Sequence, residues 1–132
     1  MTMIISCRVI TPNGLLWEGT TEDLILPTRT GQIGILREHG SMLSALDVGV
    51  VKVNSGTNLL KFFIMEGFAE IEKNSVSILC AGAEEASTIN AEKAKTELKN
   101  LTSLVKTSIT SEDRIEAKME LRKAKARLEA LE

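Results

Sequence analysis

Residues 48–80, VGVVKVNSGTNLLKFFIMEGFAEIEKNSVSILC, consist of short apolar runs separated by turn residues. The runs are rich in Val, Ile, Leu and Phe, and the breaks contain Asn, Ser and Gly, which is typical of consecutive β-strands. Alternation in residues 68–72 predicts one buried and one solvent face, whereas VGVVKV and SVSILC are apolar enough to be central strands. This segment therefore predicts a strand-rich domain.

The same pattern extends towards the N-terminus. Three further runs, IISCRVI, GTTEDLILP and QIGIL, are separated by Pro-Asn-Gly and Thr-Arg-Thr-Gly. Short strands at such regular spacing favour a β-sandwich or a barrel over repeated strand-helix-strand units.

The composition changes near residue 83. All nine glycines, both prolines and all four aromatic residues lie in residues 1–82, whereas the last fifty residues carry ten acidic and ten basic side chains. The second composition strongly favours helix, so two architectures share one chain.

Two amphipathic helices are predicted in this second part. The first follows Asn90, an expected N-cap, and its apolar stripe is Ala94, Leu98, Leu101 and Val105. The second follows Thr110, which resembles the start of a capping box with Asp113, and its stripe is Ala117, Leu121, Ala124, Leu128 and Leu131. A short polar turn between them predicts an antiparallel hairpin, which has to lean on another surface because isolated helices of this length are marginal in water.

Charge and hydropathy exclude several classes of partner. The formal charge is −2 and no basic stripe is interleaved with aromatic residues, so we expect no nucleic-acid partner. No apolar run approaches the roughly 20 residues that span a bilayer, so we expect no direct insertion into a membrane. The N-terminal residues lack the pattern of a signal or transit peptide, and we expect the protein to work where it is made.

The chain carries no recognisable motif for catalysis, metal binding or cofactor binding. The nucleophile elbow, zinc-protease and P-loop motifs are missing, and the glycines of TGQIGI precede no helix. Cys7 and Cys80 lie in apolar strands, so we expect buried free thiols in a reducing compartment. A competing hypothesis is an enzyme that uses Cys7 or Cys80 with the single histidine, His39, and it predicts a thiol of low pKa.

Several segments together resemble a known family. TPNGLLWEGTTEDLILP, PTRTGQIGILREHGSMLSALDVGVVKV and MEGFAEIEKNSVSIL are similar to the epsilon subunit of the F-type ATP synthase, and LRKAKARLEAL is similar to the end of its chloroplast and cyanobacterial forms. The resemblance covers nearly the whole chain. It implies an α+β fold, with an N-terminal antiparallel β-sandwich of about ten strands in residues 1–86 and a C-terminal antiparallel two-helix hairpin in residues 87–132.

The resemblance also implies partners. In the family, the sandwich binds the foot of the gamma subunit and rests on the polar loops of the proton-carrying membrane ring. The match places Gly31, Gln32 and His39 in or beside the loop that faces them, where glycines allow close approach. The alternative is that Gly31 and Gly34 only turn the chain and that His39 only satisfies loop carbonyls. Where the family usually has Leu-Pro-Asn-His-Ala-Pro-Leu, residues 36–42 here are LREHGSM, which removes two prolines and adds an Arg-Glu pair.

For the hairpin, the resemblance implies two positions. In the first position the hairpin packs on the sandwich. In the second it extends along gamma into the hexamer of alpha and beta subunits, where it restrains ATP hydrolysis. Weak docking on the sandwich would make the two positions similar in free energy. The resemblance implies that a basic cluster contacts an acidic segment of a beta subunit: Arg122, Lys123, Lys125 and Arg127. The alternative is a solvated face balanced by glutamates of the same helix.

Some bacterial relatives bind ATP between the two helices. The residues aligned with their motif are Ile89, Asn90, Lys93, Ala94, Lys123 and Arg127. Asn replaces an Asp, and Lys replaces Arg twice, although an ammonium does not reproduce the planar fork of a guanidinium. We expect weak or no binding of ATP.

The sequence therefore predicts a non-catalytic rotor subunit of the central stalk, without a cofactor. We expect it at the thylakoid membrane as a peripheral subunit, on the stromal or cytoplasmic side, or else on the cytoplasmic face of a bacterial plasma membrane. A competing hypothesis is a free-standing ligand-binding β-sandwich with a helical oligomerisation tail. It predicts a concave aromatic-lined face, against which one Trp, three Phe and no Tyr argue.

Overall fold

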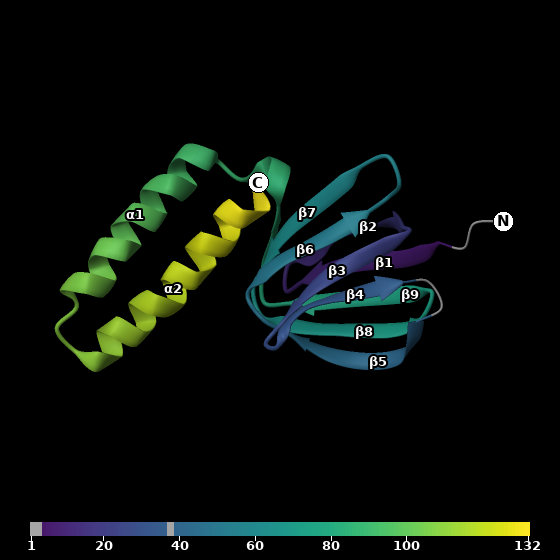
Figure 1. Ribbon diagram of the computed structural model, residues 1–132, viewed down its shortest axis with the longest axis horizontal. Helices are drawn as coiled ribbons and strands as arrows, with labels where there is room; N and C mark the ends of the chain where they lie inside the picture. Colours follow the sequence, from purple (N-terminus) through teal and green to yellow (C-terminus); the bar gives the residue numbers. More distant parts are fainter. Residues whose placement is uncertain (1–3, 37–38) are drawn as a thin grey trace.

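Within residues 4–36 and 39–132, which the computed structural model describes apart from the side chain of His39, ten strands form two five-stranded sheets (Figure 1). The first sheet has the order β2-β1-β9-β8-β5, with β1 (Ile5–Thr11), β2 (Gly14–Thr21), β5 (His39–Leu46), β8 (Gly67–Lys73) and β9 (Ser75–Cys80). The second has the order β10-β7-β6-β3-β4, with β3 (Asp23–Thr28), β4 (Gly31–Leu36), β6 (Gly49–Asn54), β7 (Leu59–Ile64) and β10 (Ala83–Glu85). The predicted β-sandwich is confirmed.

The strand pairs of the described chain are antiparallel except for β1 and β9. These two strands run parallel at the centre of the first sheet, with Cys7 opposite Val76 and Val9 opposite Ile78. The first strand is therefore held by one of the last strands of the sandwich.

One apolar core lies between the two sheets. Alternate residues of both sheets point into it, from Ile5 of β1 to Ile78 of β9, and both are fully buried. The single tryptophan packs against this core, with the ring centroid of Trp17 5.5 Å from that of Phe62. Every core residue in the described chain comes from the sandwich and none from the helices.

The strand predictions hold for the apolar runs and fail where the pattern is weak. VGVVKV and SVSILC form β6 and β9, and each is the central strand of its sheet, as predicted. GTTEDLILP was predicted as one strand, but it is divided between β2 and β3, and the buried Thr21 hydroxyl lies 2.5 Å from the carbonyl oxygen of Asn54. The strand β5, HGSMLSAL, has no β-branched residue and was missed, because only its pairing with β8 supports it.

The C-terminal part forms the predicted antiparallel hairpin. After a 3₁₀ turn at Ala86–Thr88, α1 spans Ala91–Thr107 and α2 spans Ser111–Ala130. Both expected N-caps are present: Asn90 Oδ1 accepts from the Lys93 N–H and Thr110 Oγ1 accepts from the Asp113 N–H, each at 3.1 Å. In the described part of the chain, neither helix combines the length and the apolar character that a membrane span requires.

Candidate functional site: the docked hairpin and the uncovered sheet face

The C-terminal end of α2 packs on the outer face of the second sheet, against β6 and β7 (Figure 1). Ala126 and Ala130 lie four residues apart, hence on one face of α2, and they are buried together with Val50 and Phe63. This cluster is separate from the sandwich core. The hairpin is therefore attached through a small apolar contact made by the last turns of one helix.

Arg127 strengthens this contact from the edge. Its Nε lies 3.0 Å from Glu84 Oε2 of β10, and its Nη1 lies 3.3 Å from Glu97 Oε2 of α1. The guanidinium carbon stands 4.9 Å from the centre of the Phe63 ring, within the range of a cation–π contact. One side chain thus joins α2 to β10, to β7 and to its partner helix.

The other residues of the basic cluster are more loosely held. Arg122 Nη2 lies 2.7 Å from Asp47 Oδ2, between β5 and β6, but the arginine side chain is 57% exposed, and such pairs are typically worth about 0.2–1 kcal/mol. Lys123 pairs with Glu120 of the same helix at 3.1 Å. Lys125 is exposed and has no salt bridge within the described chain.

Five of the six residues aligned with the ATP-binding motif line one small cavity of about 230 Å³: Ile89, Asn90, Lys93, Ala94 and Arg127. Lys123 does not line it. The carboxylates of Glu84 and Glu97 line the same cavity and hold Arg127, while the Asn90 side chain caps α1. The cavity is smaller than the roughly 300–1,000 Å³ of typical ligand pockets. One of its two cations, Arg127, is already paired with both carboxylates, which leaves Lys93 as the unpaired cation among the described residues that line it.

The residues expected to face the ring and gamma lie at two separate places. Gly31 and Gln32 begin β4, whereas His39 begins β5, opposite Lys73. Because a strand rises roughly 3.3 Å per residue, β4 extends roughly 17 Å from Gly31 to Leu36, so Gly31 and Gln32 lie at the end of β4 that is farther along the chain from His39. Gly31 has a φ of 123°, so it does turn the chain between β3 and β4. The predicted Arg-Glu pair at positions 37 and 38 lies outside the described residues.

An exposed apolar row, which the sequence analysis did not find, crosses the outer face of the first sheet. The strand register places one member on each of the five strands, in the order Ala45, Phe68, Leu79, Ile10 and Leu15. Phe68 is 55% exposed, Leu79 45% and Leu15 55%. Nothing in the described chain packs over this row as α2 packs over the second sheet.

A signal for this row was present in the sequence. Alternation assigns Phe68 and Leu79 to the solvent face, yet both are large and apolar. The strand β6 is also apolar on both faces, and there α2 covers the outward Val50. A strand that is apolar on both faces, and whose outer face no helix packs against, indicates a contact surface for another chain.

The two cysteines are buried and unpaired. Burial raises the pKa of the Cys7 thiol to about 12. Burial also raises the pKa of Cys80, against the opposing effect of a hydrogen bond with the Gly82 backbone. The thiol of low pKa that the enzyme hypothesis predicts is therefore wrong for both residues.

Comparison with known proteins identifies the family. Residues 4–86 match the family described as ATP synthase, Delta/Epsilon chain, beta-sandwich domain. The chloroplastic ATP synthase epsilon chain of Emiliania huxleyi is 50% identical over 129 residues, which cover 98% of this chain and 99% of that one. The ATP synthase epsilon chain of Trichodesmium erythraeum (strain IMS101) is 40% identical over 97% of this chain and 96% of its own.

Solved structures share the fold at low sequence identity. A chain of the Euglena gracilis mitochondrial ATP synthase, OSCP/F1/c-ring in rotational state 1, has a TM-score of 0.87 and 20% identity, over 98% of this chain and 82% of that chain. A chain of the Tetrahymena thermophila mitochondrial ATP synthase central stalk/cring has a TM-score of 0.67 and 13% identity, over 97% of this chain and 96% of that chain. The fold, the family match and near full-length relatives at up to 50% identity agree. The chain belongs to the ATP synthase epsilon chain family.

Proposed function

We propose that the protein is a non-catalytic subunit of the central stalk of a proton-translocating F-type ATP synthase, where its sandwich couples the gamma subunit to the membrane ring. The observation that carries this proposal is the apolar row across the outer face of the first sheet. At about 25 cal/mol per Å² of apolar surface, covering such a row supplies several kcal/mol to a protein contact. The printed titles of the structural relatives, which name a c-ring and a central stalk, support this placement.

A pull-down from detergent-solubilised membranes tests the coupling role. The unaltered chain should co-recover alpha, beta and gamma chains, and the double variant Phe68→Asp with Leu79→Asp should lose them because the row no longer excludes water. Leu59→Asp is the matched control, since Leu59 is 57% exposed but lies on β7 in the other sheet. Equal recovery by the double variant and the control, with both folded by circular dichroism, would contradict the proposal.

Gly31, Gln32 and His39 remain the proposed contacts with the ring and the gamma foot. Their separation supports two contact points, one at each end of β4. At Gly34, within the same strand, an added Cβ would meet no atom within 4 Å, which leaves the strand surface open to a close neighbour.

The hairpin is proposed as the regulatory arm, with the division between arm and platform at residues 86 and 87. Because its docking contact is small, the hairpin would undock from the sandwich at a cost of a few kcal/mol. In the docked position Arg122 binds Asp47 and Arg127 binds Glu84, both on the sandwich, so undocking frees these contacts for the proposed acidic segment of a beta subunit, while the pair of Arg127 with Glu97 stays within the hairpin. Contact of the freed cluster with the catalytic hexamer would restrain ATP hydrolysis.

The proposed location is the surface of a thylakoid membrane, as a peripheral subunit on the stromal or cytoplasmic side. The names of the relatives, which include chloroplastic and cyanobacterial epsilon chains, support it. The chain itself would perform no bond chemistry, and the raised thiol pKa values support this.

A further inference from the structure

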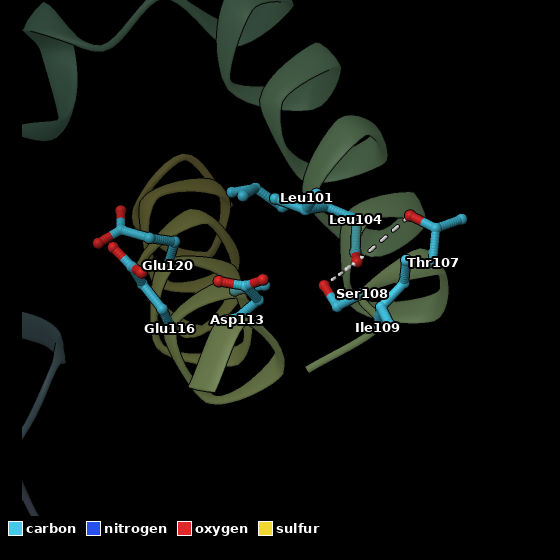
Figure 2. A pocket seen from close by; sticks show the side chains of 9 residues that line it. Leu101, Leu104, Thr107, Ser108, Ile109, Asp113, Glu116 and Glu120 are labelled. Carbon is cyan, nitrogen blue, oxygen red and sulfur yellow. Dashed lines mark hydrogen bonds between the residues drawn. The ribbon is translucent and has the colours of Figure 1, made fainter. Parts of the chain in front are cut away.

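The free end of the hairpin carries a second apolar surface, which the proposed function leaves unused. A cavity of about 520 Å³ lies between α1, α2 and the turn that joins them. Figure 2 shows Leu101 extending from α1 towards α2, with Asp113, Glu116 and Glu120 along α2 and Ile109 at the turn. The volume falls within the range of roughly 300–1,000 Å³ that is typical of ligand and side-chain pockets.

The groove exposes apolar side chains to solvent. Leu104 is 50% exposed, and Ile109, in a turn where a polar residue is usual, is 94% exposed. The hydroxyls beside them are already engaged, because Ser108 Oγ and Thr107 Oγ1 donate to the Leu104 carbonyl at 2.6 and 3.4 Å (Figure 2). The groove therefore presents hydrocarbon rather than free hydrogen-bonding groups on this side.

The wall of the groove is acidic. Asp113, Glu116 and Glu120 follow one another at helical spacing along α2. Glu120 pairs with Lys123, whereas Asp113 and Glu116 have no salt bridge within the described chain. The first half of α2 carries four acidic and two basic side chains, the latter being Arg114 and Lys118, whereas the second half holds the basic cluster.

We propose that this groove docks a basic amphipathic helix of a partner protein. Its Leu or Ile side chains would enter between Leu101, Leu104 and Ile109, and its Lys or Arg side chains would lie beside the carboxylates of Asp113 and Glu116. The occupant is a helix and not a strand for a structural reason. A third helix that packs against an antiparallel pair completes a small bundle, whereas two helices have no unpaired backbone edge with which a strand could pair. The carboxylates repel nucleotides and anionic lipids. Because this groove lies along the first half of α2 and the docking contact of Ala126 and Ala130 lies in its last turns, the hairpin can bind such a helix while it remains docked on the sandwich.

A peptide titration of the complete chain tests this proposal. The probe is a synthetic helix-forming peptide with a leucine at every third or fourth position and lysines on both flanks. The matched probe has the same leucines with glutamates in place of the lysines. The lysine peptide should shift the amide NMR signals of residues 101–120 and leave those of the sandwich unchanged, and the glutamate peptide should bind at least about tenfold more weakly.

Variants locate the contact. Ile109→Ser should weaken binding of the lysine peptide about tenfold, since it removes the most exposed apolar side chain of the groove. Glu116→Lys should weaken it about fivefold, whereas Glu129→Lys, the same charge change at the other end of α2, should not. Equal binding of both peptides, no shift in residues 101–120, or loss with Glu129→Lys would overturn the proposal. Sedimentation as a dimer that Ile109→Ser abolishes would also overturn it, because the occupant would then be a second copy of this chain.

Discussion

Among the glycines, Gly67 is the one at which an added Cβ would meet the closest atom. A Cβ there would lie 2.0 Å from the Leu79 carbonyl oxygen and 2.7 Å from Cys80 Cα, so the pairing of β8 with β9 would have to open. We expect Gly67→Ala to lower the free energy of unfolding by at least about 2 kcal/mol. Gly34→Ala, with open space at its Cβ and no positive φ, should change it by less than about 1 kcal/mol. Urea titrations of both variants measure this difference, and similar losses would contradict the clash.

Cys7 makes the stability depend on alkaline pH. Burial raises its pKa from 9.0 to about 12, so the folded state holds this proton more tightly than the unfolded chain. The thiol therefore stabilises the fold fully below about pH 9, and this contribution is lost as the pH rises towards about 12. Between about pH 8 and pH 11, the unfolding free energy of the unaltered chain should fall more steeply than that of Cys7→Ala. Parallel curves would show that the thiol ionises without unfolding.

Some individual residues could be assigned from the sequence because their role is local. Asn90 and Thr110 were predicted as N-caps, and each accepts the backbone hydrogen bond expected of a cap. Ala126 and Ala130 could not be assigned, because a small side chain acquires its role only from what packs against it, here Val50 and Phe63. Arg127 was predicted as a basic residue of the last helix, but its carboxylate partners lie 43 and 30 residues away in the sequence.

Among the elements, the helices were more predictable than the strands. The bounds of α1 and α2 follow from their N-caps and from apolar residues that recur at helical spacing within each helix. The strand β5 depends on β8, more than twenty residues later, and the sequence around it has little β propensity. The uncovered outer face of the first sheet follows from strand register, which no local pattern reveals.

The junction between the sandwich and α1 should not hold a nucleotide tightly. The carboxylates of Glu84 and Glu97 form ion pairs with Arg127, and they line the same small cavity as Lys93. We expect calorimetric titration of the isolated chain with ATP to give weak or no binding. A micromolar dissociation constant would show that Lys93 and Arg127 can exchange these carboxylates for phosphate.

The basic half of α2 should control ATP hydrolysis. Replacing Arg122, Lys123, Lys125 and Arg127 with Ala should raise the ATPase activity of the reconstituted complex, because the proposed contact with a beta subunit is lost. Lys125→Ala alone should give part of this effect without weakening docking, because Lys125 has no salt bridge within the described chain. Lys118→Ala, one charge removed outside the cluster, is the control. Unchanged hydrolysis by the fourfold variant would remove the basis for an inhibitory contact.

The molecule as a whole consists of a sandwich with its own core and a hairpin that packs on the outside of it. Because the core between the sheets draws on no described helical residue, a chain of residues 1–86 should fold cooperatively. It should lose about 1–3 kcal/mol, since Val50 and Phe63 become exposed. Residues 87–132 alone should be mostly unfolded.

Trp17 supplies the measurement for this division, since it is the single tryptophan and packs on Phe62. Its fluorescence during urea unfolding of residues 1–86 should give one transition close to that of the complete chain. A truncated chain without a transition would place the boundary elsewhere and make the helices part of the folding unit.

The parallel pairing of β1 with β9 has a consequence for how the protein is made. Translation delivers β1 and β2 first, and they can form a hairpin at once, but the other edge of β1 has no neighbour until residues 75–80 have left the ribosome. An open edge is a template for pairing with other nascent chains, so this interval is the one in which a chaperone matters most. The helices emerge last and dock on the outer face of β6 and β7, so the arm is added to a platform that is already closed.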